Sequence, residues 1–585
     1  MVHHRLLLAS AIGAVLLFGY ALNESRTAIS RGKDQYVALT RSCHEAQANA
    51  DAVAELARSI APRAAGLLER SASIFLMVCY AQQRQRLVLE QLGVSDVTLR
   101  GLDLDGLAAA DTPSVSFVAA VLKGTFERSP APQTLAVRRA PVSDDELYEV
   151  YLRRVVLDLG LRALPTKEFV ETDKFRLGQA LFFDPILSGE RDVACATCHL
   201  VERGTSDGLR RSIGAGGVGI AELRELPSGR PRQPRNALDL WNRDNNRVHT
   251  MLWDGAVEVI DTPQQRFRTP VGTMLPPGFE NLMAVQSVFP LTRTDEMLGL
   301  SGHGSAGTLP NGHANKENEI AVAGAGVPEA ERILSVFEAV MERLLGGVGS
   351  AEPWKQTYRQ LFIRAYPGEQ TFGIAHVGNA LAHFIELAFP TRETPWDIYL
   401  GGASTAISLD AKRGAFVFFG KGRCVVCHEG PLFSDFGFHS VGVPNRDPAS
   451  SDEEDFGRYV VTGNPSDKFL FRTPPLRNAT ISSPYFHNGY ARSLEDAILQ
   501  HLDPLRYADR YSTSGGHLMS AEQIAAVSPL LFPPVHLAPR ELLDLIAFIQ
   551  ALTDQNALAV SQVVPAAVPS GLPIPRATSG GTRIE

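Results

Sequence analysis

Two short segments of the chain combine two thiols with an imidazole at the same spacing. Residues 195–199 have the sequence Cys-Ala-Thr-Cys-His, and residues 424–428 have Cys-Val-Val-Cys-His. Thiols at this spacing can form thioethers with the two vinyl groups at one porphyrin edge, and the adjoining histidine can bind the iron from the same face. The pattern predicts two covalently bound haem c groups. Cys195 and Cys198 would attach the first haem and His199 would bind its iron. Cys424, Cys427 and His428 would do the same for the second haem.

A zinc or redox pair is the alternative interpretation of each Cys-x-x-Cys segment. Structural zinc takes four ligands, so each pair would need two further soft ligands nearby. The remaining cysteines, Cys43 and Cys79, cannot serve both pairs. Two copies of the same pentapeptide therefore favour haem. In an oxidising compartment Cys43 and Cys79 could instead form a disulfide, and the sequence leaves this pairing open.

The N-terminus has the charge order of an exported protein. Arg5 precedes a mostly apolar run over residues 6–22. A positive charge followed by such a run is typical of a secretory signal or an uncleaved anchor, and the run is at the short end of what can span a bilayer. We therefore expect residues 1–25 to direct the protein to the periplasm, with cleavage and anchoring both open.

Length and composition indicate a multidomain globular protein. The chain has 585 residues, of which 44% are hydrophobic and 21% charged, and its formal net charge is −8. This length predicts several domains, and the hydrophobic fraction is sufficient for buried cores. An acidic balance without a long basic run excludes nucleic acid as an expected partner.

The composition and periodicity of the sequence divide the chain into five parts. Apolar residues recur at helical spacing over residues 52–85 and 144–157, and again over 328–345 and 376–388. We expect a mainly α-helical protein with two cytochrome c-type haem domains behind an N-terminal helical domain of unknown role. The segment after the second haem domain is rich in Pro, Ala, Gly and Ser, which predicts a disordered tail. The boundaries are 1–25 for the signal or anchor, 26–160 for the helical extension, 161–400 and 401–555 for the haem domains, and 556–585 for the tail.

Further blocks surround the two thiol motifs in a fixed order. They are Leu-Gly-Gln-Ala-Leu-Phe-Phe-Asp-Pro at 177–185 with Leu-Ser-Gly at 187–189, Pro-Arg-Asn at 234–236, Trp-Asp-Gly at 253–255, Pro290 with Glu-Met at 296–297, Gly-Pro-Leu-Phe at 430–433, Pro-Pro-Leu-Arg-Asn at 474–478 and Pro-Tyr-Phe-His-Asn-Gly at 484–489. With these blocks, residues 165–555 resemble the bacterial di-haem cytochrome c peroxidase and MauG family. Residues before 165 lie outside the resemblance.

The resemblance implies a role for each haem and for three side chains. The first haem would be the peroxide site, and the second would pass electrons to it. Glu296 matches the family's catalytic glutamate, which can take a proton from one peroxide oxygen and return it to the other. Gln286 matches a position that lines the pocket. Trp253 matches the tryptophan between the haems, where an indole can divide one long electron transfer into two shorter ones.

The resemblance also implies a calcium ion between the haem domains. Its ligands would be the side chain of Asn236 and the backbone carbonyls of Ser482 and Pro484. Oxygen ligands of this kind suit a hard cation such as Ca²⁺, with water completing the coordination shell.

The sequence departs from the family at the first haem. Many members cap this haem in the resting state with a histidine in a Ser-Ile-Gly-His loop, and here the loop over residues 212–217 is Ser-Ile-Gly-Ala-Gly-Gly. Ala215 cannot bind iron, so we expect an open sixth position even in the oxidised protein. His249 is the nearest substitute ligand, although an Arg/Asn-rich loop is an equally good location for it.

A second departure concerns the second haem, whose distal ligand in the family is methionine or tyrosine. That ligand lies 14 residues after the histidine of the Tyr-Phe-His-Asn-Gly block, and counting from His487 gives His501. A bis-histidine second haem follows as a hypothesis, and it would lower the reduction potential relative to a His/Met pair. Met519 and Tyr507 are alternative ligands nearby.

These features predict an oxidoreductase that reduces hydrogen peroxide to water, with a small cytochrome c or cupredoxin as the electron donor. One alternative is a MauG-like oxidase that modifies side chains of a partner protein. Another is a non-catalytic di-haem electron-transfer or sensor protein in which both irons are six-coordinate. Family members are often dimers, so a homodimer is also compatible with the resemblance.

Overall fold

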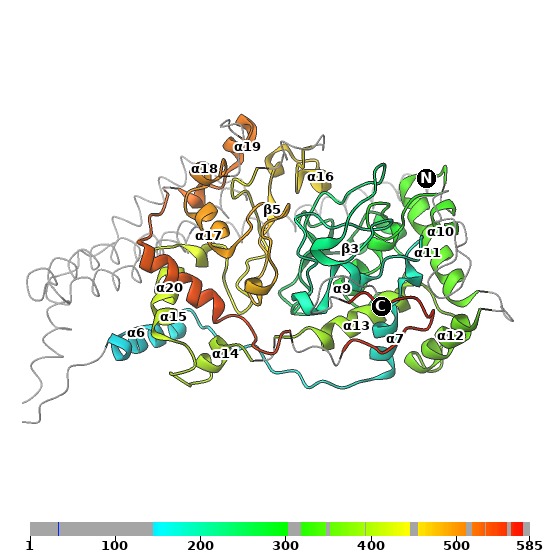
Figure 1. The fold of residues 1–585 in the computed structure, drawn as a ribbon, viewed down its shortest axis with the longest axis horizontal. Helices are drawn as coiled ribbons and strands as arrows, with labels where there is room; N and C mark the ends of the chain where they lie inside the picture. Colours follow the sequence, from blue (N-terminus) through cyan, green and yellow to red (C-terminus); the bar gives the residue numbers. More distant parts are fainter. Residues whose placement is uncertain are drawn as a thin grey trace, which may run out of the picture. The chain divides into compact units, whose positions relative to one another are not determined.

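A computed structural model gives the fold of the described part of the chain (Figure 1). The described residues are 33, 144–301, 318–323, 325–346, 352–391, 393–444, 454–510, 518–532, 534–558 and 563–576. The predicted signal or anchor, most of the helical extension, and Cys43 and Cys79 lie outside them. Within these ranges, no helix has the length and apolar character needed to cross a membrane.

The described elements are mainly helical, as predicted. The longer helices are α6 (Asp144–Asp158), α7 (Asp173–Phe183), α11 (Glu329–Leu345), α12 (Pro353–Ala365), α13 (Ile374–Ala388), α15 (Leu409–Phe419), α17 (Leu494–Leu502) and α20 (Pro539–Gln550). The shorter ones are α8 (Cys195–Cys198), α9 (Leu282–Gln286), α10 (Glu319–Val322), α14 (Pro395–Leu400), α16 (Tyr459–Thr462), α18 (Pro504–Tyr507) and α19 (Ala521–Ala526). The helices predicted over 328–345 and 376–388 are confirmed as α11 and α13.

The chain divides into two compact units. One consists of residues 1–159 with 415–426, and the other of residues 160–414 with 427–585. In the first unit, the edge of Tyr148 on α6 packs against Phe416 on α15, with ring centroids 5.4 Å apart. The second unit contains most of the described elements. The domain boundaries drawn from the sequence stay predictions.

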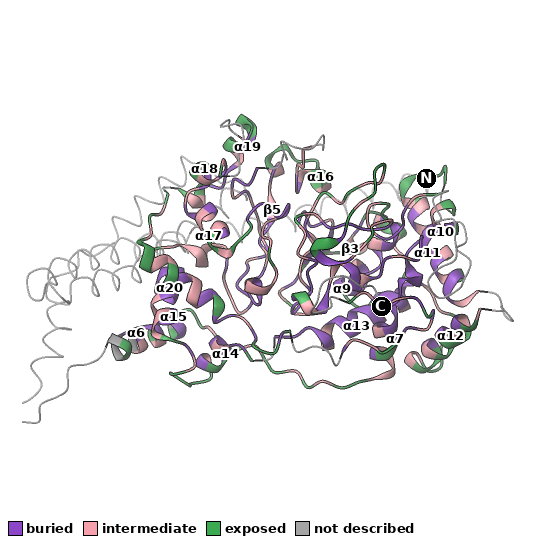
Figure 2. Cartoon of the chain, in the orientation of Figure 1, coloured by how far each residue is buried: buried purple, intermediate pink, exposed green. Residues whose placement is uncertain are grey.

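The core of the second unit is built around α7, α9 and α13 (Figure 1). The apolar face of α13 is buried, as Figure 2 shows. Phe384 on this face lies 5.0 Å from Phe182 on α7, ring centroid to ring centroid. The two helices approach closely at Gly178, where a side chain would begin 2.0 Å from the carbonyl oxygen of Ala380. This packing fixes the segment after α7, which leads into the first thiol motif.

Two small antiparallel sheets complete the second unit. One has the order β1 (Thr250–Met251), β2 (Val257–Thr262), β3 (Gln265–Arg268), and the other pairs β4 (Phe438–His439) with β5 (Phe471–Arg472). Met251 lies opposite Val257, so the loop between β1 and β2 presents Trp253 at its turn. Gly255 in this loop has a φ of +70°, and a side chain there would meet the Arg458 guanidinium at 2.4 Å.

The prediction of a disordered tail over 556–585 was wrong for residues 563–576. Val563, Val568, Leu572 and Ile574 are buried in the same core as α7. The Ser570 hydroxyl and backbone N–H both donate to the buried carboxylate of Asp184. Apolar residues alternate here with prolines, which lack an N–H group and therefore need fewer backbone partners when buried. The composition is typical of a linker. The sequence does not reveal this packing, because the residues around α7 that bury the segment lie far away along the chain.

Candidate haem sites

The first thiol motif forms a single helical turn. In α8 the Thr197 hydroxyl accepts a hydrogen bond from the Ala194 N–H (3.0 Å), which caps the turn, and His199 follows directly. The Nδ1 of His199 lies 3.2 Å from the carbonyl oxygen of Thr205. A carbonyl can only accept, so Nδ1 carries the proton in this contact, and Nε2 is the nitrogen that a metal would take. Burial lowers the pKa of His199, which keeps the ring neutral.

A cavity of about 580 Å³ adjoins this motif, a volume in the usual range for cofactor sites. Most of the side chains predicted for the first haem site line it, together with two arginines that the sequence did not single out. They are Cys195, Cys198, His199, Asn236, Arg243, Trp253, Gln286, Glu296 and Arg472. The structure therefore brings the proposed iron ligand and the proposed proton carrier to one cavity.

The two arginines have unused hydrogen-bond donors. Arg472, on β5, is 1% exposed, and its Nε donates to the Leu252 carbonyl. Arg243 forms an ion pair with Asp239. Among the described residues, the Nη1 of each arginine has no hydrogen-bond partner. Burial, together with the charge of Arg243, lowers the pKa of Arg472 to about 9. Buried cations require an anion, and the two carboxylates of a haem fit this need.

Glu296 lies in the turn after the 3₁₀ helix at Phe289–Thr292. Its carboxylate forms an ion pair with the Nε of Arg293 at 3.1 Å. Burial, together with the charge of Asp295, raises the pKa of Glu296 to about 7, although Arg293 opposes the shift. A carboxyl group with this pKa can both accept and release a proton near neutrality.

Gln286 ends α9, and its Oε1 is a buried acceptor with no hydrogen-bond partner among the described residues. This oxygen can therefore accept a hydrogen bond from a molecule in the cavity. The placement fits the pocket-lining position that the resemblance implied.

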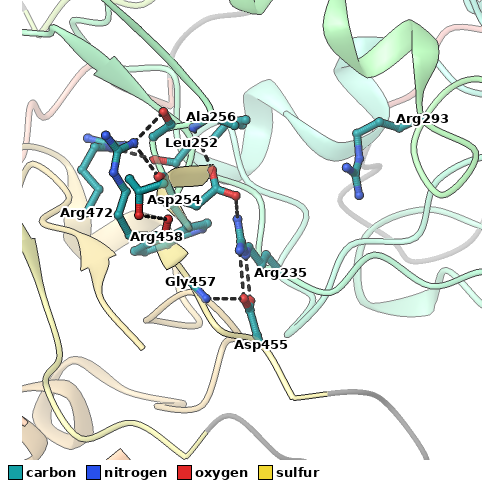
Figure 3. Close-up of polar contacts among 12 residues, drawn as sticks. Arg235, Leu252, Asp254, Ala256, Arg293, Asp455, Gly457, Arg458 and Arg472 are labelled. Atoms are coloured by element: carbon teal, nitrogen blue, oxygen red, sulfur yellow. Dashed lines mark hydrogen bonds and ion pairs between the residues drawn. The ribbon is translucent and has the colours of Figure 1, made fainter. Parts of the chain in front are cut away.

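Trp253 is buried and held at both its ring and its loop. The indole Nε1 donates to the Asn236 carbonyl at 2.9 Å, and the ring lies 6.5 Å from that of His487. Figure 3 shows how the loop is fixed. Arg235 bridges Asp254 and Asp455, and Arg458 donates to the carbonyls of Asp254 and Gly255. The network ties the tryptophan loop to residues that follow the second thiol motif.

Asn236, predicted to bind calcium, is hydrogen-bonded to the segment that contains the other two predicted ligands. The Asn236 N–H donates to the carbonyl oxygen of His487 at 2.6 Å, three positions after Pro484. The Asn236 side chain donates to the Leu209 carbonyl at 2.7 Å, and the Ser482 hydroxyl donates to Ala479. The structure thus connects Asn236 to the Pro484 block through the backbone, and calcium binding there stays a prediction.

The loop that departs from the family lies beside Glu296. The Ala215 N–H donates to the Glu296 carbonyl oxygen at 2.7 Å, and the Ala215 methyl is buried. His249, the substitute ligand considered above, is exposed and pairs through Nδ1 with the Arg247 carbonyl. It is not among the residues that line the cavity.

Two imidazoles lie close together at the second site. The ring centroids of His428 and His501 lie 6.0 Å apart. Their Nδ1 atoms pair with the carbonyls of Phe433 (2.9 Å) and Ala497 (2.8 Å), which leaves both Nε2 lone pairs free. Two imidazoles on one metal, with bonds of about 2 Å, would have centroids about 6 Å apart. The ring of Tyr507, one alternative ligand, instead contacts Arg506 and Arg510.

The zinc alternative has limited support. Cys427, Asp435 and His439 have ligand atoms within 4.8 Å of one another, and in the described ranges this is the only such group. It supplies three ligands at the second motif and none at the first, whereas a structural zinc site needs four at each. The paired geometry at His428 and the cavity at His199 fit haem.

Two thiol–imidazole motifs, one beside a cavity and one with a second imidazole, define the class of di-haem c-type proteins. Residues 172–405 match the model of the family described as di-haem cytochrome c peroxidase. The match to this family's model confirms the resemblance inferred from the motifs.

Curated relatives extend the similarity beyond the family match. The methylamine utilization protein MauG of Methylorubrum extorquens is 27% identical over 394 residues, which cover 67% of this chain and 82% of that protein. The cytochrome-c peroxidase IdrP1 of a Pseudomonas species is 26% identical, covering 65% and 81%. A crystal structure of a MauG-like protein associated with microbial copper homeostasis is 24% identical, covering 69% and 96%, with a TM-score of 0.46.

Arg243 and Arg472 are functional candidates that the sequence did not reveal. Both are charged residues in loops or short strands, where exposure is the ordinary expectation. The position of Arg472, two residues before the Pro-Pro-Leu-Arg-Asn block, was the only signal available.

Proposed function

We propose that this chain is a di-haem c-type peroxidase that catalyses H₂O₂ + 2e⁻ + 2H⁺ → 2H₂O. The observation that carries the proposal is the cavity that Glu296 shares with His199 and the thiols of Cys195 and Cys198. A carboxyl group whose pKa lies near neutrality is thereby available where peroxide would bind.

Each side chain at the first site has a role. Cys195, Cys198 and His199 would hold the first haem, which would supply the redox chemistry for peroxide reduction. Glu296 takes the proton from one peroxide oxygen and returns it to the other, which then leaves as water. The free Oε1 of Gln286 accepts a hydrogen bond from the bound peroxide.

Electrons enter at the second site. His428 and His501 would hold the second haem as a bis-histidine pair, and this haem would supply electron transfer without a position for substrate. Trp253 lies along the route to the first site, since its ring lines the first cavity and contacts His487. The donor is a small cytochrome c or cupredoxin in the periplasm, where the mature protein is either soluble or anchored by its N-terminal segment. A calcium ion at Asn236, Ser482 and Pro484 and a homodimer complete the proposal.

Peroxide turnover tests the function directly. The haem-loaded protein is supplied with reduced small cytochrome c, and peroxide-dependent oxidation is followed for the native chain, Glu296→Gln and the exposed control Glu369→Gln. We expect turnover by the native chain, a fall of about 10²- to 10⁴-fold for Glu296→Gln, and an unchanged rate for the control. Equal rates for Glu296→Gln and the native chain would contradict the role of Glu296.

A MauG-like oxidation of a partner protein is the second candidate. Ala215 favours it, because no histidine from the 212–217 loop can close the first site in the oxidised protein. In that case peroxide would be consumed with a protein substrate as the reductant. Turnover with reduced cytochrome c but without a protein substrate would exclude this candidate.

A further inference from the structure

Residues 212–219 form a segment that packs directly on the backbone of Glu296. Besides the Ala215 hydrogen bond, Gly214 is so close that a side chain would begin 2.2 Å from the carbonyl oxygens of Asp295 and Glu296. Such contact is possible only for glycine. The position of this segment therefore determines the position of the Glu296 backbone.

The other side of the same segment faces the first thiol motif. The Ile213 carbonyl oxygen lies 4.0 Å from the Sγ of Cys198, and Ile213 is buried. Residues 212–219 thus span the distance between the haem attachment and the proposed proton carrier. A shift of this segment would change the position of Glu296 relative to the haem.

One buried guanidinium holds the segment in place. Arg224 donates from Nε to the Ile213 carbonyl (2.8 Å), from Nη2 to Gly214 (2.8 Å) and from Nη1 to Gly219 (2.9 Å). Arg224 is 5% exposed. The planar guanidinium can satisfy three carbonyls in one plane, which the single ammonium of lysine cannot do with the same geometry.

A buried carboxylate fixes the middle of the segment. The Gly216 N–H donates to Oδ2 of Asp192 at 2.5 Å. Asp192 also supplies a favourable negative charge to Arg224, as does Asp207. Neither Asp192 nor Asp207 is among the residues that line the cavity.

We propose that Arg224, assisted by Asp192, is a positioning residue that sets the Glu296 carboxylate over the first haem by holding residues 212–219 in one conformation. The inference rests on the proposed peroxidase function. In many family members this segment carries a capping ligand, whereas here it carries Ala215, so the first site stays open. Arg224 fixes the carbonyls of the segment, which keeps the open site ordered. The contacts are with backbone carbonyls, which carry no titratable or redox-active group.

The test is a double-mutant cycle on the haem-loaded full chain. Arg224→Lys keeps the charge but loses the three-carbonyl geometry, and we expect kcat for peroxide reduction to fall about 10- to 100-fold, as for a displacement of about 1 Å. In the Glu296→Gln background, the same change should alter the rate less than twofold, because Arg224 acts through Glu296. The control Arg203→Ala removes an exposed ion pair with Glu222 near the same segment and should leave kcat unchanged.

A spectroscopic readout is independent of turnover. Electron paramagnetic resonance of the oxidised native chain should give a single high-spin ferric signal from the first haem, and Arg224→Lys should split it or convert part of it to low spin. Asp192→Asn, which retains an oxygen acceptor, should give a smaller change of the same kind and replaces Arg224→Lys if that variant fails to fold.

Different results would contradict the peroxidase function and the positioning role of Arg224. Absence of turnover in the native chain overturns the peroxidase function, and the high-spin signal then decides the positioning role alone. A native rate and signal in Arg224→Lys, or a full loss of rate on adding Arg224→Lys to Glu296→Gln, would overturn the positioning role while peroxidase function stands.

Discussion

The two thiol motifs have the same spacing but different surroundings. At the second, His501 faces His428 at the separation expected for two ligands on one metal. At the first, His199 opens on a cavity that also contains Glu296 and the free acceptor of Gln286. Under the proposed function, the same pentapeptide would serve electron transfer where a second imidazole lies beside it, and substrate chemistry where a cavity and a carboxyl group take that place.

The largest effect is expected when one haem attachment site is removed at a time. The double change of Cys195 and Cys198 to alanine should leave one haem per chain and abolish peroxide turnover, since no thioether can form at the first motif. The same change at Cys424 and Cys427 should also leave one haem but spare the high-spin signal. Mass spectrometry and haem content per chain check both results. Two haems in either variant would contradict the assignment of the motifs.

His501→Ala should turn the second site into one that resembles the first. Loss of the distal imidazole should eliminate the low-spin signal of the second haem, while the matched change Met519→Leu should leave it intact. Optical and electron paramagnetic resonance spectra of both variants make the comparison. An unchanged low-spin signal in His501→Ala would show that another side chain is the ligand.

Arg472→Met tests whether the first site holds a buried anion. If Arg472 pairs with a haem carboxylate, its loss should lower the free energy of unfolding of the haem-loaded protein by about 3 kcal/mol, because a buried charge loses its partner. The surface control Arg176→Met should have no measurable effect. Denaturant unfolding, followed through the haem absorbance, gives both values. Equal stability of Arg472→Met and the native protein would mean that this guanidinium holds no buried anion.

A smaller, graded effect is expected from pH. Glu296 must be ionised to accept the peroxide proton, and burial raises its pKa to about 7. The rate of reaction with peroxide should therefore be maximal above pH 7 and fall about tenfold per pH unit below it. Glu296→Gln should be slow and should lack this dependence. Stopped-flow measurements from pH 5 to 8, at about unit intervals, test the slope, and an identical profile in the variant would assign the titration to another group.

How far the sequence predicts this molecule depends on the range of each interaction. The thiol motifs and the helices α11 and α13 follow from local spacing, whereas His501 was found by counting from His487 along the family resemblance. The structure contains both helices and brings His501 close to His428. Arg472 and Arg224 were missed because their burial results from segments far away in the chain. The same limitation explains residues 563–576, where proline and small residues suggested disorder although the apolar side chains between them complete the core around α7.

The most direct test of the central claim is electron paramagnetic resonance of the fully oxidised two-haem protein, with the two signals integrated. We predict equal amounts of a high-spin ferric haem, at His199, and a low-spin haem, at His428 and His501. Two low-spin haems in equal amounts would contradict it, because the first site would then offer no position at which peroxide could bind beside Glu296.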